Sequence, residues 1–166
     1  RDNMYRLKGY NPNDLNCIND SQVQNSFSFY APIGCESLLL NLNQTIESIT
    51  GKKLYPCYTY SRIYYHDAVM EKHIDRPSCE YSATLTLSIT EKPWMIWVKD
   101  LTGDERPVNL LVGDMCVYKG DELEHWRENP YKGNKQIQCF LHFVDANGEY
   151  AEFKYDKRPI LGQPAS

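Results

Sequence analysis

From residue 54 onward the chain is a succession of short strand-like segments separated by turn signals, and no other feature limits its fold as strongly. In the stretch 81–89, apolar side chains alternate with hydroxyl side chains, which is the period of a strand with one buried face. Dipeptides such as Gly113-Asp114 and Asn147-Gly148 are typical of turns between strands. We expect strands at 54–65, 81–89, 94–99, 108–112, 115–118, 137–144 and 150–155, with a shorter one at 26–30. Many short strands at regular spacing predict a β-sandwich or barrel.

One amphipathic helix is predicted in front of these strands, at about residues 36–50. Its apolar residues recur at helical spacing, at Leu38, Leu39, Leu42, Ile46 and Ile49. Gly51 follows directly, and glycine is common just past a helix because it adopts the left-handed conformation there. We expect the apolar face of this helix to cover one sheet.

The length of 166 residues is typical of one domain, and the sequence contains no linker or repeat. We therefore expect a single domain over residues 1–166, with its core at about 55–155. The net charge of −4 argues against a nucleic-acid partner. The longest strongly apolar run, 94–98, is far shorter than the roughly 20 residues of a membrane helix, so we expect no membrane partner either.

Six cysteines are spread along the chain with no C-x-x-C pair, which excludes a zinc ribbon or a thioredoxin-type motif. A domain of this size needs no disulfide to fold, so these residues are predicted to be buried free thiols. Residues 1–13 are polar and lack the apolar centre of a signal peptide. A cytoplasmic protein in a reducing compartment is the expectation.

The strongest chemical signal is the H-x-D formed by His73 and Asp75, together with His125. On a strand, residues two apart point to the same face, so the imidazole and the carboxylate can converge on one ion. Two histidines and one carboxylate form the facial triad of non-haem Fe(II) oxygenases, which leaves positions open for the oxidant and a co-substrate. An H-x-D arises by chance in roughly a quarter of chains of this composition, so alone it also fits a surface histidine in a charged turn.

Lys135 lies ten residues after His125, across a turn that contains Pro130 and Gly133. If it reaches the interior, its ammonium can pair with the distal carboxylate of a 2-oxoglutarate co-substrate. By spacing alone it fits equally well as a solvated loop lysine next to Lys132.

Two blocks of the sequence resemble prolyl 4-hydroxylase-like 2-oxoglutarate/Fe(II) dioxygenases. In the first, residues 64–75, Tyr64 precedes the H-x-D by nine residues, where the family has a tyrosine that contacts the co-substrate. In the second, residues 125–135, His125 is followed by Gly133 at +8 and Lys135 at +10, as in the family. The resemblance covers about residues 55–145, and the preceding helix also suits the family.

The resemblance implies a mostly β fold with flanking helix: a double-stranded β-helix, which is a cupin-like jelly roll, with a helix packed on one sheet. It implies Fe(II) bound by His73, Asp75 and His125, and 2-oxoglutarate with its C5 carboxylate on Lys135 and Tyr64. O2 is the oxidant, and ascorbate is an optional further cofactor. The reaction converts 2-oxoglutarate to succinate and CO2 and hydroxylates a C–H bond of the substrate.

The chain also departs from the family pattern. The usual glycine between the tyrosine and the H-x-D is absent, and Arg127 stands two residues after His125, where a hydrophobic residue is frequent. Hydroxyl residues replace a tyrosine on the strand after the H-x-D, and one of them is expected to hydrogen-bond the co-substrate: Thr84, Thr86 or Ser88.

Three further side chains are assigned by strand parity. Arg62 shares parity with Tyr64, and Arg127 shares parity with His125, so both arginines are candidates for binding an anionic substrate. A salt bridge to one of the 22 acidic residues explains either arginine equally well. His142 has the opposite parity to Lys135 and is expected on the outer face of its sheet.

The expected substrate is a prolyl residue in a protein or peptide. A free amino acid or another small metabolite is the alternative within the same class, because fold does not decide substrate. From other classes, a non-catalytic jelly-roll binding protein and a zinc hydrolase remain open. The sequence leaves the oligomeric state open.

Overall fold

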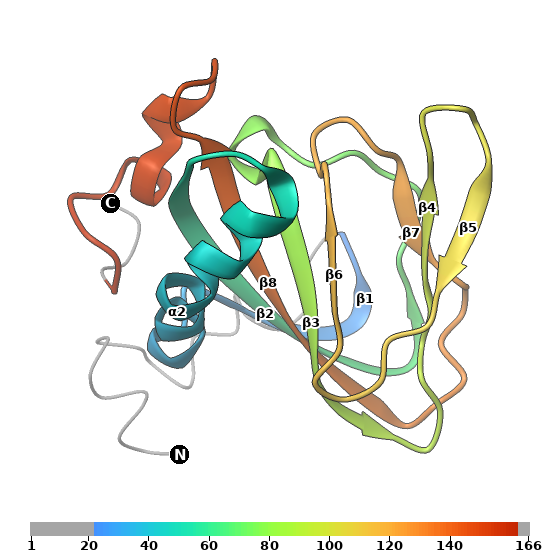
Figure 1. Ribbon diagram of the computed structural model, residues 1–166. Helices are drawn as coiled ribbons and strands as arrows, with labels where there is room; N and C mark the ends of the chain where they lie inside the picture. Colours follow the sequence, from blue (N-terminus) through green and yellow to red (C-terminus); the bar gives the residue numbers. More distant parts are fainter. Residues whose placement is uncertain (1–21, 163–166) are drawn as a thin grey trace.

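A computed structural model describes residues 22–162 and contains two antiparallel sheets that face each other, with one long helix outside the larger sheet (Figure 1). The larger sheet has the strand order β1-β2-β8-β3-β6 and the smaller one the order β5-β4-β7. The strands are β1 (Gln24–Tyr30), β2 (Leu54–Val69), β3 (Tyr81–Thr90), β4 (Ile96–Lys99), β5 (Glu105–Val108), β6 (Met115–Tyr118), β7 (His125–Arg127) and β8 (Lys135–Asp145). The helices are α2 (Ile33–Thr50) and two 3₁₀-helices, η2 (Pro77–Cys79) and η3 (Ala151–Lys157).

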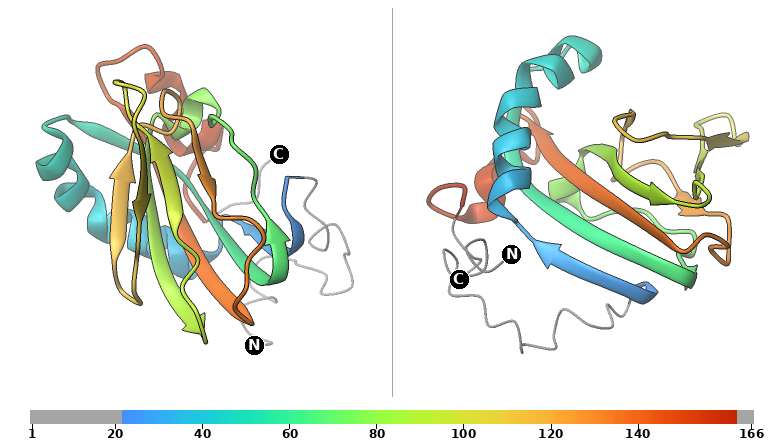
Figure 2. Two further views of the ribbon diagram at one scale, coloured as in Figure 1. Left: turned by 90° about the vertical axis from the view of Figure 1, so that its right-hand side faces the viewer. Right: turned by 90° about the horizontal axis from the view of Figure 1, so that it is seen from below.

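Helix α2 covers the outer face of the larger sheet, as both views in Figure 2 show. Its fully buried Leu39 and Ile46 pack against Cys139, Leu141 and Phe143 of β8. These three β8 residues alternate along the strand, so they lie on one face of β8, the face that α2 covers. The helix ends at Gly51, which has a φ of 68° and donates its backbone N–H to the carbonyl of Glu47. The expected helix and its position on one sheet are confirmed, although Ile49 is exposed.

The inner face of the larger sheet is mostly polar and looks toward the smaller sheet. Directly paired residues of neighbouring strands share a face, and the register therefore aligns inner-face rows across β2, β8 and β3. These rows are Tyr58–His142–Ser82, Tyr60–Phe140–Thr84 and Arg62–Gln138–Thr86, followed by the pair Tyr64–Gln136. The inner face therefore offers hydrogen-bonding and ionisable side chains to the space between the two sheets.

Several expected boundaries differ in the structure. The segment expected as a strand at 150–155 forms η3, and β5 ends at Val108 instead of covering 108–112. Five cysteines are free thiols, namely Cys35, Cys57, Cys79, Cys116 and Cys139, whereas Cys17 lies outside the described residues. Within residues 22–162, no helix has both the length and the apolar character to cross a membrane.

Candidate metal centre

His73 and His125 lie side by side because two short segments pair through their backbones. His73 belongs to the loop after β2, and His125 is the first residue of β7. Each backbone N–H donates to the carbonyl of the other residue, at 3.1 Å from His73 and 2.9 Å from His125. The ring centroids are 4.3 Å apart. The main-chain hydrogen bonds therefore hold the two residues side by side, with their rings next to each other.

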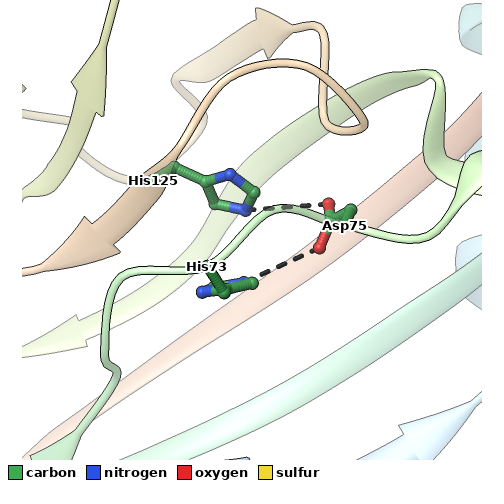
Figure 3. A group of neighbouring side chains, drawn as sticks. All are labelled: His73, Asp75 and His125. Carbon is green, nitrogen blue, oxygen red and sulfur yellow. Dashed lines mark ion pairs between the residues drawn. The ribbon is translucent and has the colours of Figure 1, made fainter.

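Asp75 completes the group from the same loop as His73. Its backbone N–H donates to the carbonyl of Gly120 at 2.8 Å. One carboxylate oxygen lies 3.6 Å from Nε2 of His73 and the other lies 3.6 Å from Nε2 of His125 (Figure 3). The three ligand atoms lie within 4.8 Å of one another. This separation brings two nitrogens and one carboxylate around a single point, as the facial triad requires.

Backbone carbonyls determine which nitrogen of each histidine faces the group. Nδ1 of His73 lies 2.8 Å from the carbonyl of Glu71, and Nδ1 of His125 lies 2.9 Å from the carbonyl of Leu123. A carbonyl oxygen only accepts, so both Nδ1 atoms carry the proton and both Nε2 atoms present a lone pair toward Asp75. Histidines that ligate a metal are oriented in this way by their second nitrogen.

Burial sets the charge of this group. His125 is 1% exposed, and burial, with smaller contributions from His73 and Arg127, lowers the pKa of His125 to about 4. Burial also raises the pKa of Asp75, although His142, His73 and Ser82 act in the opposite direction. A neutral imidazole at pH 7 is the form that binds a metal. The donor set therefore suits a divalent transition metal such as Fe(II).

A cavity of about 290 Å³ adjoins the three ligands. Besides the triad, tyrosines of β1 and β2 line it, and so do Arg62 and His142. Arg62 is 4% exposed and lies on the inner face, as its strand parity predicts. Tyr64 is also on the inner face and fully buried, and its hydroxyl donates to the sulfur of Met70, a cavity residue, at 3.8 Å.

The structure does not bring Lys135 to the other predicted site residues. Lys135 pairs with Tyr65, whose side chain is 43% exposed, and it shares the face of β8 that carries Cys139 and Leu141. Its neighbour Gln136 points inward instead. The expectation that Lys135 reaches the interior is therefore corrected, because strand alternation places it on the outer face.

Arg127, by contrast, lies inside with its side chain fully buried. One guanidinium nitrogen, Nη1, donates to the backbone carbonyl of Trp94. The guanidinium carbon lies 5.4 Å from the ring centre of Tyr64 and 5.5 Å from that of Trp94. His125 and Arg127 are thus both buried on the same face of β7, as their spacing of two residues predicts.

The three hydroxyl residues of β3 do not share one face. Thr84 and Thr86 point inward and both donate to the side-chain oxygen of Gln138, at 3.2 and 3.3 Å. An irregularity in the pairing between Thr86 and Ser88 places Ser88 opposite Ile137, on the outer face. Ser88 is thereby removed as a candidate contact for a co-substrate.

His142 is a residue whose position the sequence interpretation placed wrongly. It lines the cavity, accepts or donates a hydrogen bond at 2.9 Å between Nδ1 and the Ser82 hydroxyl, and stacks on Tyr58 with ring centres 4.5 Å apart. Lys135 was expected on the inner face of β8 and His142 on the opposite, outer face. Because the inner and outer faces are the other way round, both expectations are wrong together. His142, Cys79 and Asp75 also bring three donor atoms within 4.8 Å of one another, so Asp75 lies between two groups of possible ligands.

Comparisons with known proteins find the same fold at low sequence identity. No protein-family model matches the sequence, and no curated protein matches it. Among solved structures, a prolyl-4-hydroxylase from Pseudomonas putida aligns over 77% of this chain and 75% of its own, with 16% identity and a TM-score of 0.60. HygX from Streptomyces hygroscopicus, solved with nickel, 2-oxoglutarate and hygromycin B bound, aligns over 78% and 73%, with 11% identity and a TM-score of 0.61.

A third similar structure is an oxidoreductase of the 2OG-Fe(II) oxygenase family from Burkholderia pseudomallei, with 15% identity and a TM-score of 0.59. The alignment covers 68% of this chain and only 58% of the Burkholderia chain. At these identities the likeness concerns the fold. The chain has the jelly-roll fold of 2-oxoglutarate/Fe(II) oxygenases, a group that includes prolyl 4-hydroxylases.

Proposed function

We propose that this protein is an Fe(II)- and 2-oxoglutarate-dependent dioxygenase that hydroxylates a C–H bond. The observation that carries the proposal is the convergence of two Nε2 lone pairs and one carboxylate beside a cavity. These groups come from a loop and from a strand of the smaller sheet, and backbone hydrogen bonds hold both histidines in the ligating orientation.

The residues around the triad have distinct tasks in such an enzyme. His73, Asp75 and His125 would hold Fe(II), which supplies the activation of O2 that is coupled to decarboxylation of 2-oxoglutarate. Tyr118, which is 7% exposed, packs edge-on against His125, with the ring centres 4.8 Å apart, and would support the orientation of that ligand. The tyrosines of β1 and β2, together with Arg62, would position the substrate against the open coordination positions.

A prolyl residue in a protein or peptide is the proposed substrate, and the similarity in fold to a prolyl-4-hydroxylase supports it. A small molecule is the second candidate. Two observations favour it: the cavity of about 290 Å³ is lined by several buried side chains, and HygX, with the same fold, binds hygromycin B. Strand parity makes Arg62 and Arg127 candidates for contact with a substrate. Arg62 lines the cavity and is proposed for this role, whereas Arg127 is not among the lining residues.

Anaerobic spectroscopy tests the proposal. Fe(II) and 2-oxoglutarate together should give a weak visible absorption band at about 500 nm, as expected for a 2-oxo acid chelated to a facial triad. His73→Ala and Asp75→Ala should each abolish both the band and the conversion of 2-oxoglutarate to succinate. His66→Ala is the matched control, since His66 is exposed, outside the cavity, and should behave as the wild type.

The outcomes separate the alternatives. A folded wild-type protein that gives no band with Fe(II) and 2-oxoglutarate contradicts the proposed function. A band without succinate formation in air favours the non-catalytic binding protein. Hydrolytic activity that depends on zinc and ignores 2-oxoglutarate favours the hydrolase.

A further inference from the structure

A second group of possible ligands shares Asp75 with the triad. Asp75, Cys79 and His142 bring a carboxylate oxygen, a thiol sulfur and an imidazole nitrogen within 4.8 Å of one another. All three residues line the cavity of about 290 Å³, so an ion that reaches the triad can also reach this group. Cys79 is 2% exposed and His142 is 5% exposed. Donors of three chemical types thus converge here, and two of them, Cys79 and His142, have no task in the proposed dioxygenase.

The fold places these donors by main-chain contacts. Asp75 belongs to the loop after β2, whereas Cys79 ends η2 and donates its backbone N–H to the carbonyl of Arg76 at 2.9 Å. His142 lies on the inner face of β8, directly opposite Ser82 of β3. A loop, a short helix and a strand therefore meet at one part of the cavity wall.

The two ligands that the triad does not use have their own supporting contacts. The hydroxyl of Tyr58 lies 3.1 Å from Sγ of Cys79, and its ring stacks on His142 with ring centres 4.5 Å apart. The hydroxyl of Ser82 donates to the backbone carbonyl of Cys79 at 3.0 Å and lies 2.9 Å from Nδ1 of His142. Because that hydroxyl proton is given to the carbonyl, Nδ1 donates to Ser82 and Nε2 keeps its lone pair. Partners of this kind orient the ligands of metal sites.

The second group is softer than the triad. Thiolate and imidazole ligands suit Zn(II) and similar ions, whereas two imidazoles and a carboxylate suit Fe(II). A thiolate and a carboxylate together neutralise a divalent cation, and neutrality favours a site with buried ligands. On binding, a sulfur–metal bond replaces the S–H bond of Cys79 and the proton passes to solvent, with no change of oxidation state. Three protein ligands leave the fourth tetrahedral position of Zn(II) to water.

We propose that Asp75, Cys79 and His142 form a second cation site, selective for thiophilic divalent ions such as Zn(II) and Co(II), and that this site and the triad compete for Asp75. Both oxygens of Asp75 lie 3.6 Å from a nitrogen of the triad. Two divalent cations on one carboxylate also repel each other. An ion at the second site therefore weakens metal binding by the triad, which would inhibit the proposed enzyme. The inference goes beyond the proposed function, because the site binds its ion whether or not the protein turns over 2-oxoglutarate.

Co(II) is the probe for the thiolate ligand, because sulfur-to-metal charge transfer adds a near-ultraviolet absorption band that nitrogen and oxygen ligands do not give. Anaerobic titration of the metal-free wild type should give this band. His73→Ala removes a ligand of the triad only and should keep the band, whereas Cys79→Ser should lose it. The matched control is Cys116→Ser, because Cys116 is a free thiol outside the cavity and its replacement should leave the band unchanged.

Mn(II) tests the competition for Asp75. Mn(II) prefers oxygen and nitrogen ligands, so an excess fills the triad and leaves the thiolate to Co(II). This excess should weaken the binding of Co(II) to the thiolate site by at least about tenfold in the wild type, the scale expected when a supporting ligand is engaged elsewhere. It should have no such effect in His73→Ala, whose triad is incomplete. Equal Co(II) affinities with and without Mn(II) in the wild type would contradict the competition.

The remaining outcomes bear on the site itself. A band that persists in Cys79→Ser, or that is missing from both the wild type and His73→Ala at millimolar Co(II), overturns it. If Cys79→Ser fails to fold, His142→Asn takes its place and should weaken the binding of Co(II) to the thiolate by at least about tenfold. An unchanged affinity overturns the site as well. The proposed function fails separately: a wild type that gives no band at about 500 nm with Fe(II) and 2-oxoglutarate rejects the dioxygenase and leaves this site intact.

Discussion

Gly120 lies against Asp75, the carboxylate of the proposed metal centre. Its carbonyl accepts the backbone N–H of Asp75 at 2.8 Å. A β-carbon at this position would lie 2.6 Å from the carbonyl oxygen of Cys79, 2.6 Å from the hydroxyl of Ser82 and 2.8 Å from a carboxylate oxygen of Asp75. No real β-carbon tolerates such distances to a backbone atom, so any other residue must displace the loop that carries Asp75.

Gly120→Ala should therefore weaken metal binding without removing a ligand. We expect at least about a tenfold loss of affinity for Mn(II) or Fe(II), and a loss of stability of about 1–3 kcal/mol, the usual cost of overpacking. Metal titration and chemical denaturation measure the two effects. Gly34→Ala is the control, because a β-carbon on Gly34 meets nothing within 4 Å. Equal metal affinities of both variants would contradict this role of Gly120.

His142 predicts how the metal-free protein responds to acid. Burial lowers the pKa of His142 from 6.5 to about 4, although the charge of Asp75 acts in the opposite direction. Between these two pH values the unfolded chain binds a proton that the folded protein does not, so the free energy of unfolding decreases as the pH falls from about 6.5 to 4. His125 acts in the same direction.

Replacing His142 with Asn should reduce this dependence. Urea denaturation at several pH values, with a chelator present, should give a shallower decrease in the free energy of unfolding for His142→Asn than for the wild type. The same slope in both proteins would show that His142 is not held neutral by burial.

At the scale of elements, a buried ion pair connects helix α2 to the segment after η3. Glu36 accepts a hydrogen bond from Arg158 at 2.6 Å, and the exposed fractions of the two side chains are 4% and 2%. Arg158 also donates to the carbonyl of Cys57 in β2 at 3.1 Å. The segment after η3 is therefore tied to both α2 and β2 at one buried pair.

Glu36→Gln should destabilise the protein by about 3–5 kcal/mol, because it leaves the Arg158 charge buried without its counter-ion. The matched control is Glu152→Gln, which breaks the ion pair of Glu152 with Lys157, where both side chains are more than half exposed. That change should cost at most about 1 kcal/mol. Denaturation of the two variants under the same conditions makes the comparison, and similar losses would contradict it.

Strand β7 has only three residues, yet it presents both a proposed metal ligand and a buried cation. His125 and Arg127 point inward and Trp126 lies between them, stacked on Trp97 of β4 with ring centres 6.1 Å apart. Such a short strand depends on its neighbours for its conformation. Its pairing with β4 and the bridge to His73 fix the direction of both side chains.

At the scale of the whole molecule, a metal ion would link the two sheets, which are otherwise connected at this point by the short backbone bridge between His73 and His125. His73 and Asp75 belong to the connection between two strands of the larger sheet, whereas His125 begins a strand of the smaller sheet. An ion bound to all three would resist separation of the two sheets. Since the unfolded chain does not bring these ligands together, binding stabilises the folded state.

We expect Mn(II), at a concentration one hundred times its dissociation constant, to raise the free energy of unfolding by about 2.7 kcal/mol. Removal of the metal with a chelator should reverse the gain, and His125→Ala should abolish it. Thermal or chemical denaturation with and without metal measures this coupling. Stabilisation that persists in His125→Ala would place the ion elsewhere.

Part of this architecture could be predicted from the sequence by itself. The helix before Gly51, the alternation of β3 and the inward parity of Arg62 with Tyr64 all depend on local periodicity, whereas the grouping of the H-x-D with His125 was an expectation from the resemblance of two distant sequence blocks to a known family. The periodic features are visible in the sequence because a few neighbouring residues determine them.

Only the tertiary structure decided which face of β8 is the interior. Alternation divides the strand into two sets of residues, and both sets contain polar and apolar side chains, so Lys135 and His142 were assigned to the wrong faces. The irregular pairing that turns Ser88 outward and the 3₁₀-helix at 151–157 also depend on contacts with distant segments. Period-two alternation divides a strand into two faces, but it does not say which face is the interior of the jelly roll. The packing of α2 on Cys139, Leu141 and Phe143 decides this, because it makes their face the outer one.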